Sequence, residues 1–135
     1  MSLDARGELA GLLAAFNLRF PDTRLSSPIS SHADQNCLVI KVDGELDSKN
    51  SFAFFDVCVA ALPSAKALGS LVIDLSALGY ISSTGVGAMT CLLAEAGKHE
   101  ILLFLRGMHG KARDIFELLG FTSFFNCLDD APEPA

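Results

Sequence analysis

Residues 71–87, with the sequence LVIDLSALGYISSTGVG, constrain the fold more than any other part of the chain. The apolar run 71–75 is typical of a short buried strand. After residues 78–81, the chain reaches three consecutive hydroxyl residues, and then Gly85-Val86-Gly87 opens an apolar stretch with helical spacing. The pattern predicts a strand that ends where a helix begins, with hydroxyl groups at the first turn of that helix.

The hydroxyl residues Ser82, Ser83 and Thr84 have two interpretations. Serine and threonine are favoured N-caps, so a capping role accounts for their position. The first turn of a helix also carries free N–H groups and the positive end of the helix dipole, which stabilise an anion. Gly85 and Gly87 would leave room for an oxyanion or another protein to approach. The residues alone therefore leave open a capped helix and a hydroxyl that receives a phosphate.

Hydrophobic spacing predicts helices and strands in alternation along the rest of the chain. We expect helices over residues 4–18, 49–62, 84–96 and 112–119, and strands over 37–42, 71–75 and 101–105, with an edge strand around 24–30 and a short strand or turn at 124–128. In the second helix, the expected inner stripe is Phe52, Phe55, Val59 and Leu62, and Pro63 is expected to end it. Alternating elements imply an α/β fold with at least one parallel strand pair.

Composition narrows the classes of function. The chain has 135 residues, half of them hydrophobic, which suits one domain with a core. A net charge of −6 argues against binding to nucleic acid and against electrostatic attraction to anionic lipid. No apolar run approaches the roughly 20 residues of a membrane span, and no signal peptide opens the chain, so we expect a cytoplasmic protein. Cys37, Cys58, Cys91 and Cys127 are expected to be free, mostly buried thiols, because each lies in an apolar run.

The known enzyme motifs that this chain partly matches each lack a required residue. A nucleophile elbow requires glycine two residues before the serine, and Ile81 stands two before Ser83. His32, His99 and His109 lie in polar stretches and are expected at the surface. Neither a dinucleotide loop, a phosphate loop nor a metal-ligand spacing is complete, so we expect no enzyme activity, cofactor or metal. A serine hydrolase that uses Ser83 is kept as a remote alternative.

Three segments in order resemble the STAS domain family of bacterial anti-sigma factor antagonists. They are the DLS of residues 74–76 followed by YISSTGVG at 80–87, the strand and turn CLVIKVDGELD at 37–47, and the last strand and closing helix within 101–120. The resemblance covers about residues 36–128 and implies an α/β fold, a small mixed sheet of four or five strands with helices mainly on one face. Residues 1–35 would be an added helix with a linker or edge strand, and 129–135 a flexible tail.

The resemblance implies a phosphorylation-controlled protein-binding switch. In that family, the unphosphorylated form binds an anti-sigma factor that is also a serine kinase, and a phosphatase reverses the phosphorylation. The implied phosphate acceptor here is Ser83, with Ser82 and Thr84 as alternatives. The implied partner surface comprises Gly44, Glu45, Leu46, Asp47, Tyr80, Ser82, Ser83, Thr84, Gly85, Val86 and Gly87.

Two departures from the family pattern keep alternatives open. Many phosphorylated members have an acidic residue before the serine, where this chain has Ser82. A non-phosphorylated scaffold subunit of a signalling or lipid-transport assembly is therefore the alternative function. The helix over residues 4–18 precedes the family-like region, and its leucine and phenylalanine stripe is expected to cover an apolar patch of its own domain or to pair with a second chain in a homodimer.

Overall fold

The computed structural model describes residues 3–27, 37–120 and 126–128. The elements follow in the order α1 (Leu3–Arg19), β1 (Arg24–Ser26), β2 (Leu38–Leu46), α2 (Ser51–Leu68), β3 (Ser70–Ile81), α3 (Ser83–Lys98), β4 (Leu102–Arg106), α4 (Gly110–Leu118) and β5 (Asn126–Leu128). Every predicted helix and strand is present, with ends shifted by a few residues. The largest difference in length is in the strand predicted over 71–75, because β3 continues to the hydroxyl cluster.

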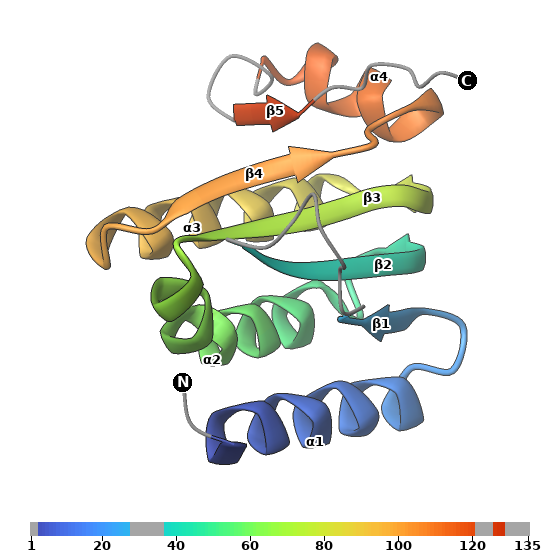
Figure 1. The fold of residues 1–135 in the computed structure, drawn as a ribbon. Helices are drawn as coiled ribbons and strands as arrows, with labels where there is room; N and C mark the ends of the chain where they lie inside the picture. Colours follow the sequence, from blue (N-terminus) through green and yellow to red (C-terminus); the bar gives the residue numbers. More distant parts are fainter. Residues whose placement is uncertain (1–2, 28–36, 121–125, 129–135) are drawn as a thin grey trace, which may run out of the picture.

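The strands form one mixed sheet in the order β1-β2-β3-β4-β5. Strands β2, β3, β4 and β5 run parallel to one another, and β1 is antiparallel to β2 at one edge. Because parallel neighbours need a crossover connection, α2 joins β2 to β3 and α3 joins β3 to β4. Figure 1 shows these two helices on the same face of the sheet. The expected small mixed sheet with helices mainly on one face is confirmed.

The hydrophobic core lies between this face of the sheet and the helices α2 and α3. Alternate strand residues point into it, because successive side chains of a strand point to opposite faces. The inward strand residues are Ile40, Val42, Leu71, Ile73, Leu75, Leu103 and Leu105, and the helices add Phe54, Cys58, Leu62, Val86, Met89 and Leu92. The core therefore fixes the register of β2 against β3, and with it the position of the residues that follow each strand.

Helix α2 differs from the prediction in its length and its buried face. It continues through Pro63 to Leu68, although a proline within a helix costs about 3 kcal/mol. Leu62 and Ala65 on either side of the exposed Pro63 are buried, so core packing outweighs this cost. Phe52 is 62% exposed, not inward as predicted, because the helix begins at Ser51 and Phe54 takes the core position.

Helix α2 is also apolar and long enough to span a membrane by length and composition alone. The sequence alone predicts no membrane span. Its apolar residues are accounted for by the core of this domain, because Phe54, Val57, Cys58 and Leu62 are buried there.

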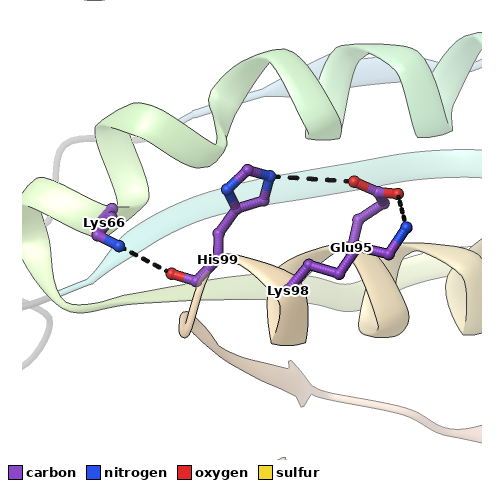
Figure 2. A network of polar contacts seen from close by, with 4 residues as sticks. All are labelled: Lys66, Glu95, Lys98 and His99. Carbon is purple, nitrogen blue, oxygen red and sulfur yellow. Dashed lines mark hydrogen bonds and ion pairs between the residues drawn. The ribbon is translucent and has the colours of Figure 1, made fainter.

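The ends of α2 and α3 are joined by polar contacts (Figure 2). The Lys66 ammonium donates a hydrogen bond to the carbonyl oxygen of His99, at 3.0 Å. On α3 itself, Glu95 pairs with Lys98 at 3.1 Å and lies 4.0 Å from the His99 ring. Since the lysine and histidine side chains are exposed and Glu95 is partly exposed, these contacts contribute little to stability.

Helix α1 packs on its own domain, which confirms the first of the two expected roles. Leu9 and Phe16 are buried where α1 contacts α2 and β1. The Asn17 side chain also accepts a hydrogen bond from the Leu25 N–H at 2.7 Å and donates one to its carbonyl at 2.9 Å. The helix is thus held to the edge strand β1 as well as to the core.

The cysteine prediction is partly wrong. Cys37, Cys58 and Cys91 are not in disulfides, but Cys58 alone is buried, Cys37 is half-buried and Cys91 is exposed. Cys91 lies in an apolar run of the sequence, yet helical spacing turns it outward while Met89 and Leu92 point into the core. Burial raises the pKa of the Cys58 thiol. The Cys127 side chain lies outside the described residues.

Candidate functional site

The predicted hydroxyl cluster and the DGELD segment meet at the carboxyl ends of β2 and β3. The first four residues of DGELD, expected to form a turn, instead belong to β2. Leu46 and Ile81 form the last register pair between these strands. One residue further, the N–H of Ser82 donates a hydrogen bond to the carbonyl oxygen of Leu46 at 2.9 Å. Parallel strands place their carboxyl ends at one edge of a sheet, so segments 35 residues apart in the chain form one candidate site.

Ser82 is the N-cap of α3. Its backbone is extended, with φ −89° and ψ 172°, and its Oγ accepts a hydrogen bond from the Gly85 N–H at 3.2 Å. This satisfies one of the N–H groups that every helix start leaves without an intrahelical acceptor. Ser82 is half-buried, and its hydroxyl therefore has the structural role that the first interpretation of the cluster assigns.

Ser83 is the first residue of α3 and is exposed. This confirms the predicted placement of the serine at a helix start just beyond a strand. Within the residues that the structure describes, the Ser83 hydroxyl makes no hydrogen bond. Thr84, the next residue, is half-buried and so less accessible than Ser83. Ser83 is consequently the hydroxyl of the three that another molecule can reach most readily, beside the positive end of the helix dipole.

The two glycines of the first turn have different roles. A Cβ on Gly85 would lie 2.6 Å from Cγ1 of Ile81 and 3.1 Å from the Leu46 carbonyl oxygen, so this glycine lets α3 pack closely on the strand ends. A Cβ on Gly87 would meet nothing within 4 Å, and Gly87 is exposed. The expected removal of bulk in front of an approaching molecule thus applies to Gly87 and not to Gly85.

The turn after β2 is built by Asp47 and Asn50. The Asp47 carboxylate accepts hydrogen bonds from the N–H groups of Lys49 at 2.9 Å and Asn50 at 3.2 Å. In return, the Asn50 side-chain oxygen accepts from the Asp47 N–H at 2.9 Å, and the Ser51 hydroxyl donates to the Asp47 carbonyl. Asp47 therefore closes the turn that precedes α2, whose N-cap position is occupied by Asn50.

A contact from outside the family-like region fixes this turn, and the sequence analysis missed it. The buried Thr23 hydroxyl donates to the Glu45 carbonyl oxygen at 2.8 Å and accepts from the Glu45 N–H at 3.3 Å. The buried Asn50 amide donates to the same Thr23 oxygen at 3.3 Å and to the Glu45 carbonyl at 3.0 Å. Gly44 has a φ of 122°, and a Cβ there would lie 2.6 Å from the Asp22 carbonyl oxygen. No local pattern around Thr23 signals such a contact.

The predicted partner surface divides by burial. Glu45, Tyr80, Ser83 and Gly87 are exposed, and Gly44, Asp47, Ser82 and Thr84 are partly exposed. Leu46, Gly85 and Val86 are buried, since they pack α3 and the strand ends onto the core, and their side chains offer no contact surface. Phe52, in the first turn of α2, is an exposed aromatic residue near this edge that the sequence analysis had placed in the core.

The histidines within the described residues do not form a hydrogen bond with Ser83. A ring nitrogen of His109 is 2.9 Å from the carbonyl oxygen of Ser76, and His99 is at the opposite end of α3 from Ser83. No hydrogen bond in the described part of the chain joins Ser83 to a histidine or a carboxylate. Among residues 3–27, 37–120 and 126–128, no group of three or more histidine, cysteine or acidic residues is placed to hold a metal ion. His32 lies outside the described residues.

Comparison with known proteins identifies the fold. A family model described as Mlab, STAS domain matches residues 29–127. An anti-sigma factor antagonist from Mycobacterium paratuberculosis is similar, with 25% identity, a TM-score of 0.61 and coverage of 79% of this chain and 86% of that one. No curated protein sequence is similar enough to be a relative.

Two further solved structures share the fold at lower identity. The Bacillus cell fate determinant SpoIIAA in its phosphorylated form has 17% identity and a TM-score of 0.56, covering 78% of this chain and 92% of that one. The murine Solute Carrier 26 family member A9 anion transporter has 15% identity and a TM-score of 0.61, covering 82% of this chain and 20% of the transporter.

Proposed function

The chain belongs to the STAS domain family, and from this premise we propose that it is an anti-sigma factor antagonist of the cytoplasm. In its unphosphorylated form, it would bind an anti-sigma factor that is also a serine kinase. Phosphorylation of Ser83 would end that binding, and a phosphatase would restore it. The observation that carries the proposal is the separation of roles between two adjacent serines, since Ser82 caps α3 while Ser83 is exposed.

The geometry around Ser83 supports a phosphate at this residue. The N–H groups of a helix's first turn lack intrahelical acceptors, and the helix dipole favours an anion there. A phosphate adds roughly −1.5 to −2 charges at neutral pH. We expect the fold to tolerate that charge, because Ser83 is exposed and the cap made by Ser82 does not involve its hydroxyl.

The same charge would weaken partner binding. Ser83 lies next to the turn that carries the carboxylates of Glu45 and Asp47 and the ammonium group of Lys49. A phosphate there adds bulk and a strongly hydrated charge that must lose its water where the partner approaches, beside the exposed Gly87. The exposed Phe52 and Tyr80 flank the same strand ends and are the residues most suited to anchor a partner, since aromatic side chains dominate many interfaces.

The test begins with the protein purified from its native cell. Mass spectrometry of the peptide that contains residues 82–84 should locate a phosphate on Ser83. Affinity for the cognate anti-sigma factor would then be measured for wild type, Ser83→Ala, Ser83→Asp and Ala94→Asp. Ala94 is exposed on α3 three turns away, so Ala94→Asp adds the same charge outside the proposed surface.

We expect Ser83→Asp to bind at least about tenfold more weakly, as a repulsive charge at an interface costs a few kcal/mol, while Ala94→Asp binds as wild type does. Ser83→Ala should bind but stay bound when kinase and ATP are present. Circular dichroism would show that all variants keep the fold. Equal affinity for Ser83→Asp and wild type would overturn the switch.

A second function has specific support. The matching family model carries the description Mlab, and the STAS-like part of an anion transporter shares the fold. Ser82 also stands where phosphorylated members often have an acidic residue. A scaffold subunit of a larger signalling or transport assembly would account for these observations. It predicts no phosphate on Ser82, Ser83 or Thr84 in protein from the native cell.

A further inference from the structure

The outward side of α1 is an apolar surface. Leu9 and Phe16 point into the domain, while Gly11, Leu12, Ala15 and Leu18 are exposed, Leu18 by 85%. No charged residue occurs between Glu8 and Arg19 in the sequence. A surface helix normally carries charged residues on the side away from the core. We call the exposed residues Gly11, Leu12, Ala15 and Leu18 the outer α1 face.

We propose that the outer α1 face is the interface of a homodimer, in which the α1 helices of two copies pack antiparallel about a twofold axis. Such an interface requires a surface that is complementary to itself. The charges that bound this face meet the requirement, because exposed Glu8 lies at its amino end and exposed Arg19 at its carboxyl end. An antiparallel pair brings Glu8 of one copy beside Arg19 of the other, whereas a parallel pair would oppose like charges.

The side chains of the face allow two helices to approach closely. In an antiparallel pair centred near residue 13, Leu18 of one copy lies over the first turns of the other, and Ala15 opposes Gly11. A Cβ on Gly11 would meet nothing within 4 Å, so the space above this glycine is open to the Ala15 side chain of the second copy. The Arg19 guanidinium lies 4.9 Å from the centre of the ring of Phe20, the next residue in the chain.

The charge of the whole chain favours a second copy over a lipid surface as the occupant. A net charge of −6 opposes approach to an anionic membrane. Two copies carry the same net charge and would also repel each other. The outer α1 face itself contains no charged residue, so no like charges meet within it. This inference concerns α1 alone and does not rest on the proposed function.

The first experiment measures the mass of the full chain in solution by light scattering and sedimentation. The chain has a mass of 14.3 kDa, and the wild-type protein should have twice that mass at concentrations of tens of micromolar. Leu18→Glu should be a monomer. The matched control is Leu118→Glu on α4, because Leu118 is an equally exposed leucine, at 81%, and the same charge is added. Circular dichroism would confirm that each variant is folded.

The second experiment tests the antiparallel arrangement by charge reversal. Glu8→Arg and Arg19→Glu should each weaken the dimer by about two- to fivefold for each of the two symmetry-related ion pairs, the range of an exposed ion pair. The double variant should regain wild-type affinity, because the pair is restored with its signs exchanged. A monomeric wild type, or equal effects of Leu18→Glu and Leu118→Glu, would overturn the dimer. Wild-type binding to phosphatidylcholine and phosphatidylglycerol vesicles that Leu18→Glu abolishes would overturn it in favour of a lipid surface.

Discussion

The hydroxyl oxygen of Thr23 lies 2.8 Å from the carbonyl oxygen of Glu45, to which it donates a hydrogen bond. The two residues are 22 positions apart, and Thr23 belongs to the segment between α1 and β1. The amide of Asn50 joins the same pair, so the turn beside Ser82 is held by a residue outside the region that resembles the family. This small buried network links the added N-terminal segment to the candidate site.

We expect Thr23→Val to loosen the turn over residues 45–50 and to lower the free energy of unfolding by about 1–3 kcal/mol. The valine removes the donor to the Glu45 carbonyl and the acceptor shared by the Glu45 backbone N–H and one N–H of the Asn50 amide. These two N–H groups lose that acceptor, and only the hydrogen bond from the Asn50 amide to the Glu45 carbonyl remains in the network. Amide hydrogen exchange, measured residue by residue, should be faster at Glu45, Asp47 and Asn50 than in wild type.

The matched control for Thr23 is Thr23→Ser, which keeps the hydroxyl and loses a methyl group. It should keep wild-type exchange rates in residues 45–50. If exchange in Thr23→Val accelerates equally in the core of β3 and in the turn, the network contributes to global stability and does not specifically position the turn.

The order and type of the elements could be predicted because each depends on local patterns. The apolar run 71–75, the three hydroxyls and the glycines predicted a strand that ends at a helix start, and Ser82 and Ser83 lie there. Helical spacing likewise predicted α1 and α3. In such segments, local propensity and the tertiary fold favour the same structure.

Contacts between distant segments could not be predicted. Pro63 normally ends a helix, yet the core needs Leu62 and Ala65, and α2 continues. Gly85 was interpreted as space for a partner, but the space is filled by Ile81, which only the packing of α3 on β3 reveals. Thr23 and Asn50 are separated by 27 residues, and no sequence pattern pairs them.

Ser82→Ala should destabilise the protein by about 1 kcal/mol, the usual cost of losing an N-cap, whereas Ser83→Ala should change stability by less than about 0.5 kcal/mol. The reason is that the Ser82 hydroxyl accepts from the Gly85 N–H, while Ser83 is exposed. Urea unfolding of the two variants gives the comparison. An equal loss in both would mean that the two hydroxyls share the cap.

Thiol reagents should separate Cys91 from Cys58. Cys91 is exposed and should react in the native protein. Cys58 is buried, and burial raises the pKa of its thiol, so very little reactive thiolate forms and the reagent has no access. Peptide mapping after brief treatment with iodoacetamide would identify the modified residue, and Cys91→Ala serves as the control. Modification of Cys58 in the folded protein would contradict its placement in the core.

Gly85→Ala should destabilise the protein by about 1–3 kcal/mol, the typical cost of forcing an extra methyl group into a packed region. The added Cβ would lie 2.6 Å from Cγ1 of Ile81 and 3.1 Å from the Leu46 carbonyl oxygen, so α3 must move away from the strand ends or Ile81 must change its rotamer. Either movement also disturbs Ser82, whose N–H is bonded to that same carbonyl. We therefore expect amide exchange to accelerate at Ser82 and at the start of α3.

The matched control is Gly87→Ala, two residues further along the same helix, where the added methyl group meets nothing within 4 Å. Alanine is the better helix former by about 1 kcal/mol, so this variant should be as stable as wild type or slightly more stable. Both midpoints would come from thermal unfolding followed by circular dichroism. Gly85→Ala is expected to lower the stability and Gly87→Ala to keep or raise it. Helix propensity changes in the same way in both variants, so it cannot be the cause of the difference. Equal stability of the two variants would mean that Ile81 yields without cost and that α3 is not held tightly against β3.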